Sequence, residues 1–289
     1  MSGEEELTVP SKVAVVGGGR MGAGIAQVFA ALGSTVVIAE AADQKAALER
    51  VEVGLARAHE RGKLDADPTE ILARVTTVGS PDELPAELDL VVEAVPEIPS
   101  LKVEVLTLID KTVSAETVIA SNTSSISIAE LGAALNDPAR FVGMHFFNPV
   151  PASTLVEIVR APATSPDVVD RVRAWVSLLG KTEVLVNDSP GFATSRLGVC
   201  LGLEAIRMLE EGVADAESID RAMELGYKHP MGPLRSTDLV GLDVRLAIAE
   251  HLESTLGDRF APPQLLRDKV ARGELGRKSG RGFHDWEVK

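Results

Sequence analysis

The stretch Val13-Ala14-Val15-Val16-Gly17-Gly18-Gly19-Arg20-Met21-Gly22-Ala23-Gly24 begins as an apolar strand and continues into a glycine-rich turn. Gly17, Gly19 and Gly22 have the G-x-G-x-x-G spacing between that strand and a following helix. In this motif the first glycine permits a tight turn, the second lets the backbone approach a pyrophosphate, and the third packs the helix against the strand. The N–H groups at the helix start favour phosphate. The stretch predicts a dinucleotide site, against the alternative of an ordinary tight turn.

A carboxylate follows the glycine motif by about twenty residues, at the end of the second predicted strand. This residue, Glu40, is placed to bind both hydroxyls of an adenosine ribose. A carboxylate also repels a 2′-phosphate, so the sequence favours NAD(H) over NADP(H). The alternative is that Glu40 is a solvated acid at a strand end.

From Lys12 onward, short β-branched runs alternate with longer segments of helical period. This alternation is typical of a parallel sheet flanked by helices, and right-handed crossovers wind such units into a doubly wound sheet. We therefore predict an α/β fold with a Rossmann-type, doubly wound, mostly parallel sheet. The expected strands are Lys12–Val16, Thr35–Glu40, Val75–Val78, Leu88–Val95, Val118–Ser121, Phe141–Phe147, Val156–Arg160 and Glu183–Val186. The expected helices are Gly22–Leu32, Asp43–Arg61, Ser100–Val113, Ser127–Leu135 and Pro166–Leu179.

The pattern changes at residues 187–191, Asn-Asp-Ser-Pro-Gly, beyond which the sequence shows no convincing strand. We expect a disordered acidic tail over residues 1–11, the Rossmann-like NAD-binding domain over 12–188, and an all-helical C-terminal domain over 189–289. The run from Phe192 to Met208 is apolar on several sides, so it is buried either in its own domain or in a dimer interface. The expected helices are Pro190–Glu211, Ala216–Leu225, Val240–Leu256 and Pro263–Arg272.

Composition narrows the class of protein. The net charge of −14 argues against nucleic acid as a partner, because phosphate binding needs a basic footprint. No apolar run approaches the roughly 18 to 20 residues that cross a bilayer. The acidic start, Met1 to Pro10, lacks the positive region of a signal peptide. We expect a soluble, cytoplasmic protein that does not bind a membrane.

The chain has one cysteine, Cys200, inside an apolar run. A single cysteine excludes an internal disulfide and a cysteine-based zinc site, and it suits a reducing cytoplasm. We interpret Cys200 as a small core residue rather than a catalytic thiol. No metal site is expected.

His145 lies at the carboxyl end of an apolar strand, in the run Gly143-Met144-His145-Phe146-Phe147-Asn148-Pro149, whereas the other histidines have polar or loop surroundings. Oxidation of a secondary alcohol needs a base with a pKa near the working pH, and histidine meets this need. After the turn at Pro149, the chain can return and place Glu157 beside His145. Pairing would satisfy a carboxylate that is costly to bury alone, and would orient the ring. The alternative is a satisfied core histidine.

Polar groups also follow the fourth and fifth predicted strands. Glu97 and Lys102 are placed to hydrogen-bond the nicotinamide ribose, with a surface ion pair as the alternative. The hydroxyl-rich turn from Ser121 to Ser127 is a third element at the same edge of the sheet, with helix capping as the alternative.

The succession of these motifs resembles the 3-hydroxyacyl-CoA dehydrogenase family, including its short-chain 3-hydroxybutyryl-CoA members. The resemblance runs from about Lys12 to Trp286. It implies NAD-dependent oxidation of an L-3-hydroxyacyl-CoA to the 3-ketoacyl-CoA, or the reverse. The matching segments are Gly17–Gly22, Ala120–Ser125, His145–Pro151, Pro190–Phe192 and Tyr227–Pro233.

The resemblance also implies roles for individual residues. His145 would be the catalytic base, Glu157 its partner, and Ser124 a contact of the substrate's 3-oxygen. The helical domain would cover the substrate and form the interface of a homodimer. The implied cofactor contacts are Gly17, Gly19, Arg20, Met21, Gly22, Glu40, Glu97, Lys102, Asn148 and Lys278.

Three positions depart from the family pattern. Ser195 stands where the family usually has Asn, which changes the hydrogen bonding available to the acyl carbonyl. Gly54 and Arg61 occupy positions where some members have a serine and a lysine that contact CoA. Arg57 and Arg61 lie one turn apart and are candidates for the CoA 3′-phosphate, with a solvated helix face as the alternative. Glu40 replaces the commoner Asp, and both carboxylates bind two hydroxyls.

Two rival functions use the same fold. One is a dehydrogenase of a free hydroxy acid or sugar acid, which would act without the CoA moiety. The other is a non-catalytic NAD-binding protein, for which the Ser195 departure is the best support.

Overall fold

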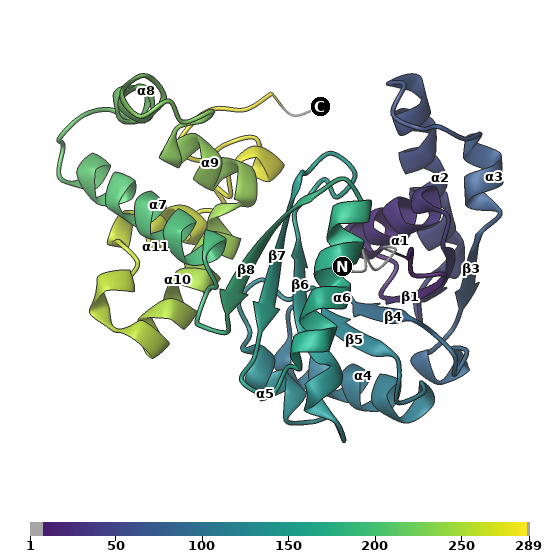
Figure 1. Ribbon diagram of the computed structural model, residues 1–289. Coiled ribbons are helices and arrows are strands. Elements are labelled where there is room, and N and C mark those ends of the chain that lie inside the picture. The colour runs from purple at the N-terminus through teal and green to yellow at the C-terminus, as the bar shows by residue number, and fades with distance from the viewer. Residues whose placement is uncertain (1–7, 288–289) are drawn as a thin grey trace, which may run out of the picture. The chain divides into compact units, whose positions relative to one another are not determined.

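The computed structural model describes residues 8–287, and the chain divides into two compact units, Met1–Asp188 and Ser189–Lys289 (Figure 1). The expected acidic tail covers residues 1–11, and the first seven of these lie outside the described residues. Pro10 is buried, and its carbonyl accepts a hydrogen bond from the Ser34 hydroxyl at 2.6 Å. The expected disorder therefore does not extend to Pro10.

The first unit is built on one eight-stranded sheet with the order β3-β2-β1-β4-β5-β6-β7-β8. All neighbouring strands are parallel except β6 and β7, which are antiparallel because a short turn joins them directly. The strand order reverses beside β1, and in doubly wound sheets ligands bind at the carboxyl ends of the strands near such a reversal. The strands are β1 (Lys12–Val16), β2 (Thr35–Ala39), β3 (Val75–Val78), β4 (Leu90–Glu93), β5 (Val118–Ser121), β6 (Phe141–Phe146), β7 (Leu155–Arg160) and β8 (Thr182–Asn187).

Helices cover both faces of this sheet (Figure 1). Because side chains alternate along a strand, Met144 and Phe146 of β6 join the core shared with α1, α2 and α6. Gly143 and His145 then face the other side, where Ile128 of α5 packs against Gly143. The helices of this unit are α1 (Arg20–Leu32), α2 (Gln44–Glu60), α3 (Pro68–Leu72), α4 (Pro99–Thr112), α5 (Ile128–Gly132) and α6 (Pro166–Leu178), with 3-10 turns at Pro81–Glu83 and Pro138–Arg140.

The predicted fold class is confirmed, and the differences are local. Helix α3 was not predicted, since five residues are too few to display a helical period. Strand β4 ends at Glu93, two residues before the predicted end. The reason is that the Val95 N–H turns back to the Glu93 carboxylate, at 2.7 Å, instead of continuing the ladder.

The second unit is a bundle of helices with its own apolar core. The expected helix from Pro190 begins four residues later, because Gly191 and Phe192 have left-handed backbone conformations (φ +72° and +50°). The expected helix from Val240 is interrupted by Gly241 (φ +109°), and a separate helix, α9, precedes it. The helices are α7 (Thr194–Glu210), α8 (Ala216–Gly226), α9 (Pro233–Val240), α10 (Leu242–Leu256) and α11 (Gln264–Ala271), with 3-10 turns at Asp258–Phe260 and Arg277–Ser279.

A buried carboxylate, Asp238 of α9, holds residues 283–286 against the helices of the second unit. It accepts the N–H groups of Phe283 and His284, both at 2.8 Å, and the indole N–H of Trp286 at 2.9 Å. The His284 ring reaches on to Asp220 of α8 at 2.8 Å. This segment forms isolated β-bridges at Arg281 and is also held by side chains of two helices.

Cys200 was expected in the core, and this expectation is wrong. It lies on an exposed face of α7, while its neighbours Val199 and Leu203 fill the core. The apolar run around it misled the prediction, because a helix presents consecutive residues on different sides. Among the described residues, no helix is both long and apolar enough to cross a membrane.

Candidate active site

The glycine turn between β1 and α1 has the close contacts that the motif predicts. A Cβ on Gly22 would lie 1.8 Å from the Gly17 carbonyl oxygen, so the helix can pack on the turn only with glycine there. Gly17 has φ +103°, and a Cβ on it would lie 2.8 Å from the Ala94 carbonyl. A Cβ on Gly19 would meet no atom within 4 Å. The turn therefore leaves open space in front of Gly19.

The start of α1 and the end of β2 complete the nucleotide end of the site. No side chain caps α1 at Gly19, so its first N–H groups remain available to an anion. Glu40 accepts the N–H groups of Gly18 at 2.7 Å and Ala42 at 2.8 Å. Burial raises the Glu40 pKa, but these hydrogen bonds and the charge of Arg50 outweigh it and lower the pKa. An ionised Glu40 beside an uncapped helix start fits a dinucleotide.

Arg50 of α2 is a contributor that the sequence reading missed. Its guanidinium donates to the Gly18 carbonyl at 3.0 Å and helps to keep Glu40 ionised. It lies ten residues beyond Glu40 on the next helix, and no motif marks it. Only the fold brings it to the turn.

His145 and Glu157 lie directly opposite each other on β6 and β7. Nδ1 of His145 is 2.8 Å from a carboxylate oxygen of Glu157. The Glu157 side chain is fully buried, and that of His145 is 9% exposed. The Phe147 ring packs against the His145 ring, with 4.4 Å between the two ring centroids. The structure thus brings together the two residues expected to pair, with the imidazole orientation set by the carboxylate.

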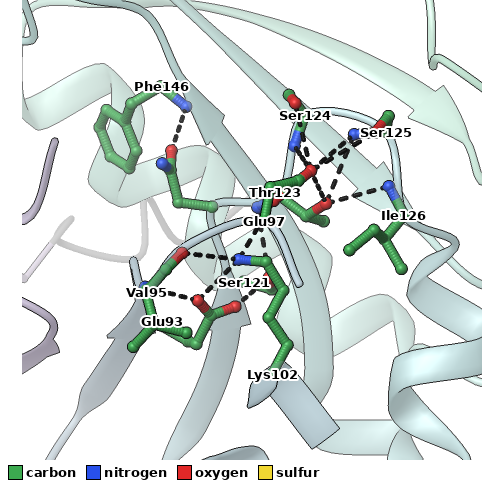
Figure 2. Close-up of polar contacts among 11 residues, drawn as sticks. Glu93, Val95, Glu97, Lys102, Ser121, Thr123, Ser124, Ser125, Ile126 and Phe146 are labelled. Atoms are coloured by element: carbon green, nitrogen blue, oxygen red, sulfur yellow. Dashed lines mark hydrogen bonds and ion pairs between the residues drawn. The ribbon is translucent and has the colours of Figure 1, made fainter. Parts of the chain in front are cut away.

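Glu97 forms the junction between the turn after β4 and the hydroxyl-rich turn after β5 (Figure 2). Its Oε1 accepts the Thr123 hydroxyl at 2.6 Å, the Ser124 N–H at 2.8 Å and the Ser125 N–H at 3.2 Å. Its Oε2 lies 3.3 Å from the Lys102 ammonium. Burial raises the Glu97 pKa, but Lys102 and the donors of the turn outweigh it and lower the pKa. Glu97 is therefore an ionised group that fixes the turn carrying Ser124.

Lys102 and Glu97 are not the surface ion pair that was the alternative interpretation. The Lys102 side chain is 1% exposed, and its ammonium lies 2.7 Å from Glu93, a carboxylate with no exposed surface (Figure 2). Glu93 was not among the predicted site residues, although an acid in an otherwise apolar strand was a usable signal. The same signal had singled out Glu157.

The polar residues of the strand ends share one face of the sheet. Glu93 pairs with Ser121 in the strand register, and Ser121 pairs with Gly143. His145 lies two residues beyond Gly143 and so points to the same side. The side chain of Asn122, another residue the sequence reading did not single out, accepts the Phe146 N–H at 2.8 Å and joins the turn after β5 to the end of β6. The face of the sheet toward α4 and α5 therefore carries both the charged cluster, formed by Glu93, Glu97 and Lys102, and the His145–Glu157 pair.

Other predicted site residues are placed as follows. Asn148 is exposed just after β6. Arg57 and Arg61 are exposed at the end of α2. The departure at Gly54 has a packing reason, because a Cβ there would lie 2.2 Å from the amide oxygen of the buried Gln27.

Two predicted residues belong to the second unit. Ser195 is in the first turn of α7, and Lys278 pairs with Asp243 at 2.6 Å. Among the described residues, no cluster of His, Cys, Asp and Glu is arranged to hold a metal ion.

A doubly wound sheet with an open glycine turn, and a buried His–Glu pair at the same edge, defines the class of nucleotide-dependent dehydrogenases. The family model for the NAD binding domain of 3-hydroxyacyl-CoA dehydrogenase matches residues 12–189. The model for the C-terminal domain of the same family matches residues 191–286. The chain belongs to the 3-hydroxyacyl-CoA dehydrogenase family.

Individual relatives cover nearly the whole chain. The "Probable 3-hydroxybutyryl-CoA dehydrogenase" of Bacillus subtilis is 44% identical over 283 residues, which are 96% of this chain and 98% of that protein. The mitochondrial hydroxyacyl-coenzyme A dehydrogenase of Sus scrofa is 38% identical, over 95% of this chain and 91% of that protein. The crystal structure of (S)-3-hydroxybutyryl-CoA dehydrogenase from Ralstonia eutropha is 42% identical, with a TM-score of 0.91, over 96% of this chain and 100% of that one. The family resemblance and NAD as the cofactor are confirmed.

Replacing Glu97 by glutamine should destabilise the first unit near neutral pH, and by less in acid. Because its folded-state pKa is lowered, Glu97 stabilises the fold above the ordinary Glu pKa of about 4.3. This contribution is lost as the pH falls from there through the lowered folded value. We expect a deficit of about 1 kcal/mol at neutral pH, small because about a third of the side chain is screened by solvent.

Urea unfolding at neutral pH and at about pH 3.5 measures this difference. Glu116→Gln, at an exposed position, is the control and should match the parent protein at both values. A deficit that stays constant or grows in acid would contradict the role of the Glu97 charge.

Proposed function

We propose that this protein catalyses the reversible, NAD-dependent oxidation of an L-3-hydroxyacyl-CoA of short acyl chain, 3-hydroxybutyryl-CoA being the expected substrate. The observation that carries the proposal is the buried His145–Glu157 pair, with 2.8 Å between Nδ1 and Oε2, at the edge that also holds the glycine turn. The family membership supports the same reaction. The chain acts in fatty acid metabolism, and its single cysteine supports a cytoplasmic location.

The chemistry of the chain's own residues follows from this geometry. Because Glu157 engages Nδ1, the His145 ring uses Nε2 to take the proton of the 3-hydroxyl. The imidazolium formed is then stabilised by the adjacent carboxylate. Ser124 would donate its hydroxyl to the substrate's 3-oxygen. NAD, when bound, supplies the hydride acceptor. In the reverse direction His145 returns the proton to the 3-keto oxygen.

The cofactor contacts divide between the two ends of the nucleotide. Residues of the glycine turn, Gly17, Gly19, Arg20, Met21 and Gly22, would bind the pyrophosphate, and Glu40 the adenosine ribose. Glu97 would bind the nicotinamide ribose, and Asn148 and Lys278 remain further proposed contacts. The open space in front of Gly19 and the ionised state of Glu40 support this division.

His145→Gln should abolish turnover and leave cofactor binding intact. We expect kcat for acetoacetyl-CoA reduction to fall by roughly a hundredfold to ten-thousandfold, the usual contribution of a general acid–base group. The dissociation constant for NADH should change by no more than about threefold, because the residue does not touch the glycine turn. Loss of NADH absorbance gives the rate, and NADH fluorescence gives the binding.

His59→Gln, at an exposed position of α2, is the control and should retain activity. A parent enzyme that consumes no NADH with acetoacetyl-CoA at micromolar concentration would sink the proposed function. Loss of NADH binding together with turnover in His145→Gln would make the residue structural.

The CoA moiety is the feature that separates the proposed function from its rivals. Arg57 is in the last turn of α2, Arg61 is the residue that ends this helix, and both are exposed. We propose that they contact the CoA 3′-phosphate, since guanidinium binds phosphate as a fork. A dehydrogenase of a free acid has no use for this pair, and a non-catalytic protein would turn over neither substrate.

The double variant Arg57→Ala/Arg61→Ala should raise KM for acetoacetyl-CoA by roughly tenfold, with kcat nearly unchanged, because the contact is the same in the ground state and the transition state. Initial rates at varied acetoacetyl-CoA measure this. Lys111→Ala, at an exposed lysine of α4, is the control for the loss of a surface cation. Equal activity of the parent enzyme on free acetoacetate would favour the free-acid rival.

We further propose that the protein is a homodimer that associates through its C-terminal helices. Leu197 of α7 and Leu225 of α8 are 70% and 64% exposed, and Tyr227 is 76% exposed. Large apolar side chains with this much exposed surface are typical of association surfaces.

Leu197→Glu should shift the protein from dimer to monomer, because it would bury a charge in an apolar interface. Sedimentation velocity at graded protein concentration measures the change. Val103→Glu, at an exposed apolar position of α4 in the first unit, should leave the dimer unchanged. A parent protein that sediments as a monomer at all concentrations would contradict the proposal.

A further inference from the structure

Glu93 is a carboxylate with no exposed surface at the carboxyl edge of the sheet (Figure 2). Its Oε1 accepts the Val95 N–H and the Lys102 ammonium, both at 2.7 Å. Its Oε2 accepts the Ser121 hydroxyl at 2.5 Å. A carboxylate without solvent contact is costly unless it is paired and hydrogen-bonded, and here each oxygen has a donor. Glu93 is therefore fully hydrogen-bonded within the edge of the sheet.

Lys102 is turned toward the protein rather than toward a ligand. Its ammonium has three N–H donors, and three oxygens surround it. These are Glu93 at 2.7 Å, the Val95 carbonyl at 3.3 Å and Glu97 at 3.3 Å. Its side chain is only 1% exposed. Lys102 therefore acts on the cofactor through Glu97, whose side chain is 36% exposed.

Glu97 in turn holds the turn that carries Ser124. One of its oxygens receives the Thr123 hydroxyl and the N–H of Ser124, and the other faces Lys102 (Figure 2). If Lys102 shifted, the Glu97 carboxylate would lose its only cation among the described residues. The 123–125 turn would then lose its anchor. The cluster is thus a series of contacts from Glu93 to Ser124.

We propose that Glu93 is a positioning residue. Through Lys102 it fixes Glu97, and through Glu97 it fixes the 123–125 turn, so the ribose acceptor and the donor to the substrate's 3-oxygen are set together. This inference rests on the proposed function, which gives Glu97 and Ser124 their ligands. Glu93 itself touches neither substrate nor cofactor.

A second buried ion pair on the same helix offers a matched control. Asp110, in the last turn of α4, lies 2.7 Å from Arg140, with side chains 2% and 9% exposed. The burial of the two side chains, the N···O distance and the charges of this pair are close to those of Glu93 and Lys102. Asp110 binds Asn136 and Arg140, which are no part of the carboxyl edge. A purely structural effect of losing a buried carboxylate should therefore be the same at both positions.

The first experiment compares Glu93→Gln with Asp110→Asn. We expect Glu93→Gln to raise the NADH dissociation constant roughly tenfold and to lower kcat by ten- to a hundredfold, as small misplacements of a site do. Asp110→Asn should lower Tm by a similar amount but leave the NADH dissociation constant within about twofold of the parent. Binding is followed by NADH fluorescence and does not require turnover.

The second experiment is a double-mutant cycle with Lys102→Met. If Glu93 acts through Lys102, adding Glu93→Gln to Lys102→Met should leave the NADH dissociation constant unchanged, because the series is already broken. The double variant carries neither buried charge, so it is the one expected to fold best. If Glu93→Gln alone does not fold, the comparison of the double variant with Lys102→Met still decides.

Each outcome has a definite meaning. An unchanged NADH dissociation constant in Glu93→Gln, or equal changes in Glu93→Gln and Asp110→Asn, would overturn the inference. Additive effects of Glu93→Gln and Lys102→Met would also overturn it. Glu97→Gln tests the proposed cofactor contact separately from the positioning role of Glu93. If Glu97→Gln weakens NADH binding while Glu93→Gln does not, the proposed site stands and only the inference about Glu93 fails. If Glu97→Gln has no effect, the proposed cofactor contact falls and the inference with it.

Discussion

The constraint on which this sheet edge depends is that a buried carboxylate must have a donor for each oxygen. Glu93, at the end of β4, and Glu157, within β7, are both fully buried in the same sheet. Each is costly in isolation and becomes favourable only through a cation or a ring placed opposite it. The partners come from different elements, Lys102 from α4 and His145 from β6. The contacts of Glu93 therefore join α4 and β5 to β4, and the contact of Glu157 joins β6 to β7.

Much of the nucleotide end could be predicted because its chemistry is local in sequence. The glycine turn needs Gly17 and Gly22 for reasons of backbone space, and the spacing displays those reasons directly. The His145–Glu157 pair could also be predicted, since a turn at Pro149 leaves little choice but an antiparallel return. In that antiparallel register His145 lies opposite Glu157, and strand alternation puts both side chains on the same face of the sheet.

The charged cluster and the helical unit could be predicted only in part, because burial is decided by tertiary packing. Lys102 follows Pro99 at the start of a helix, where a lysine is ordinarily solvated, and only the position of β4 beneath it shows that it is enclosed. Cys200 is the reverse case, an apolar residue that packing leaves exposed. Helix α9 was missed because Gly232 and Pro233 are also turn residues. Here Pro233 begins the helix, a position where its missing N–H costs nothing.

Helix α4 carries two buried ion pairs of nearly the same geometry, and only their positions distinguish them. Asp110 and Arg140 join the last turn of α4 to the loop before β6, and their surroundings are backbone carbonyls and an amide. Lys102 joins Glu93 to Glu97, whose side chain is 36% exposed. A tightly held ion pair is thus no sign of a site by itself. What distinguishes the pair at the strand ends is that Lys102 also contacts Glu97, an exposed and ionised carboxylate. A change in the buried pair can therefore alter a group that a ligand can contact.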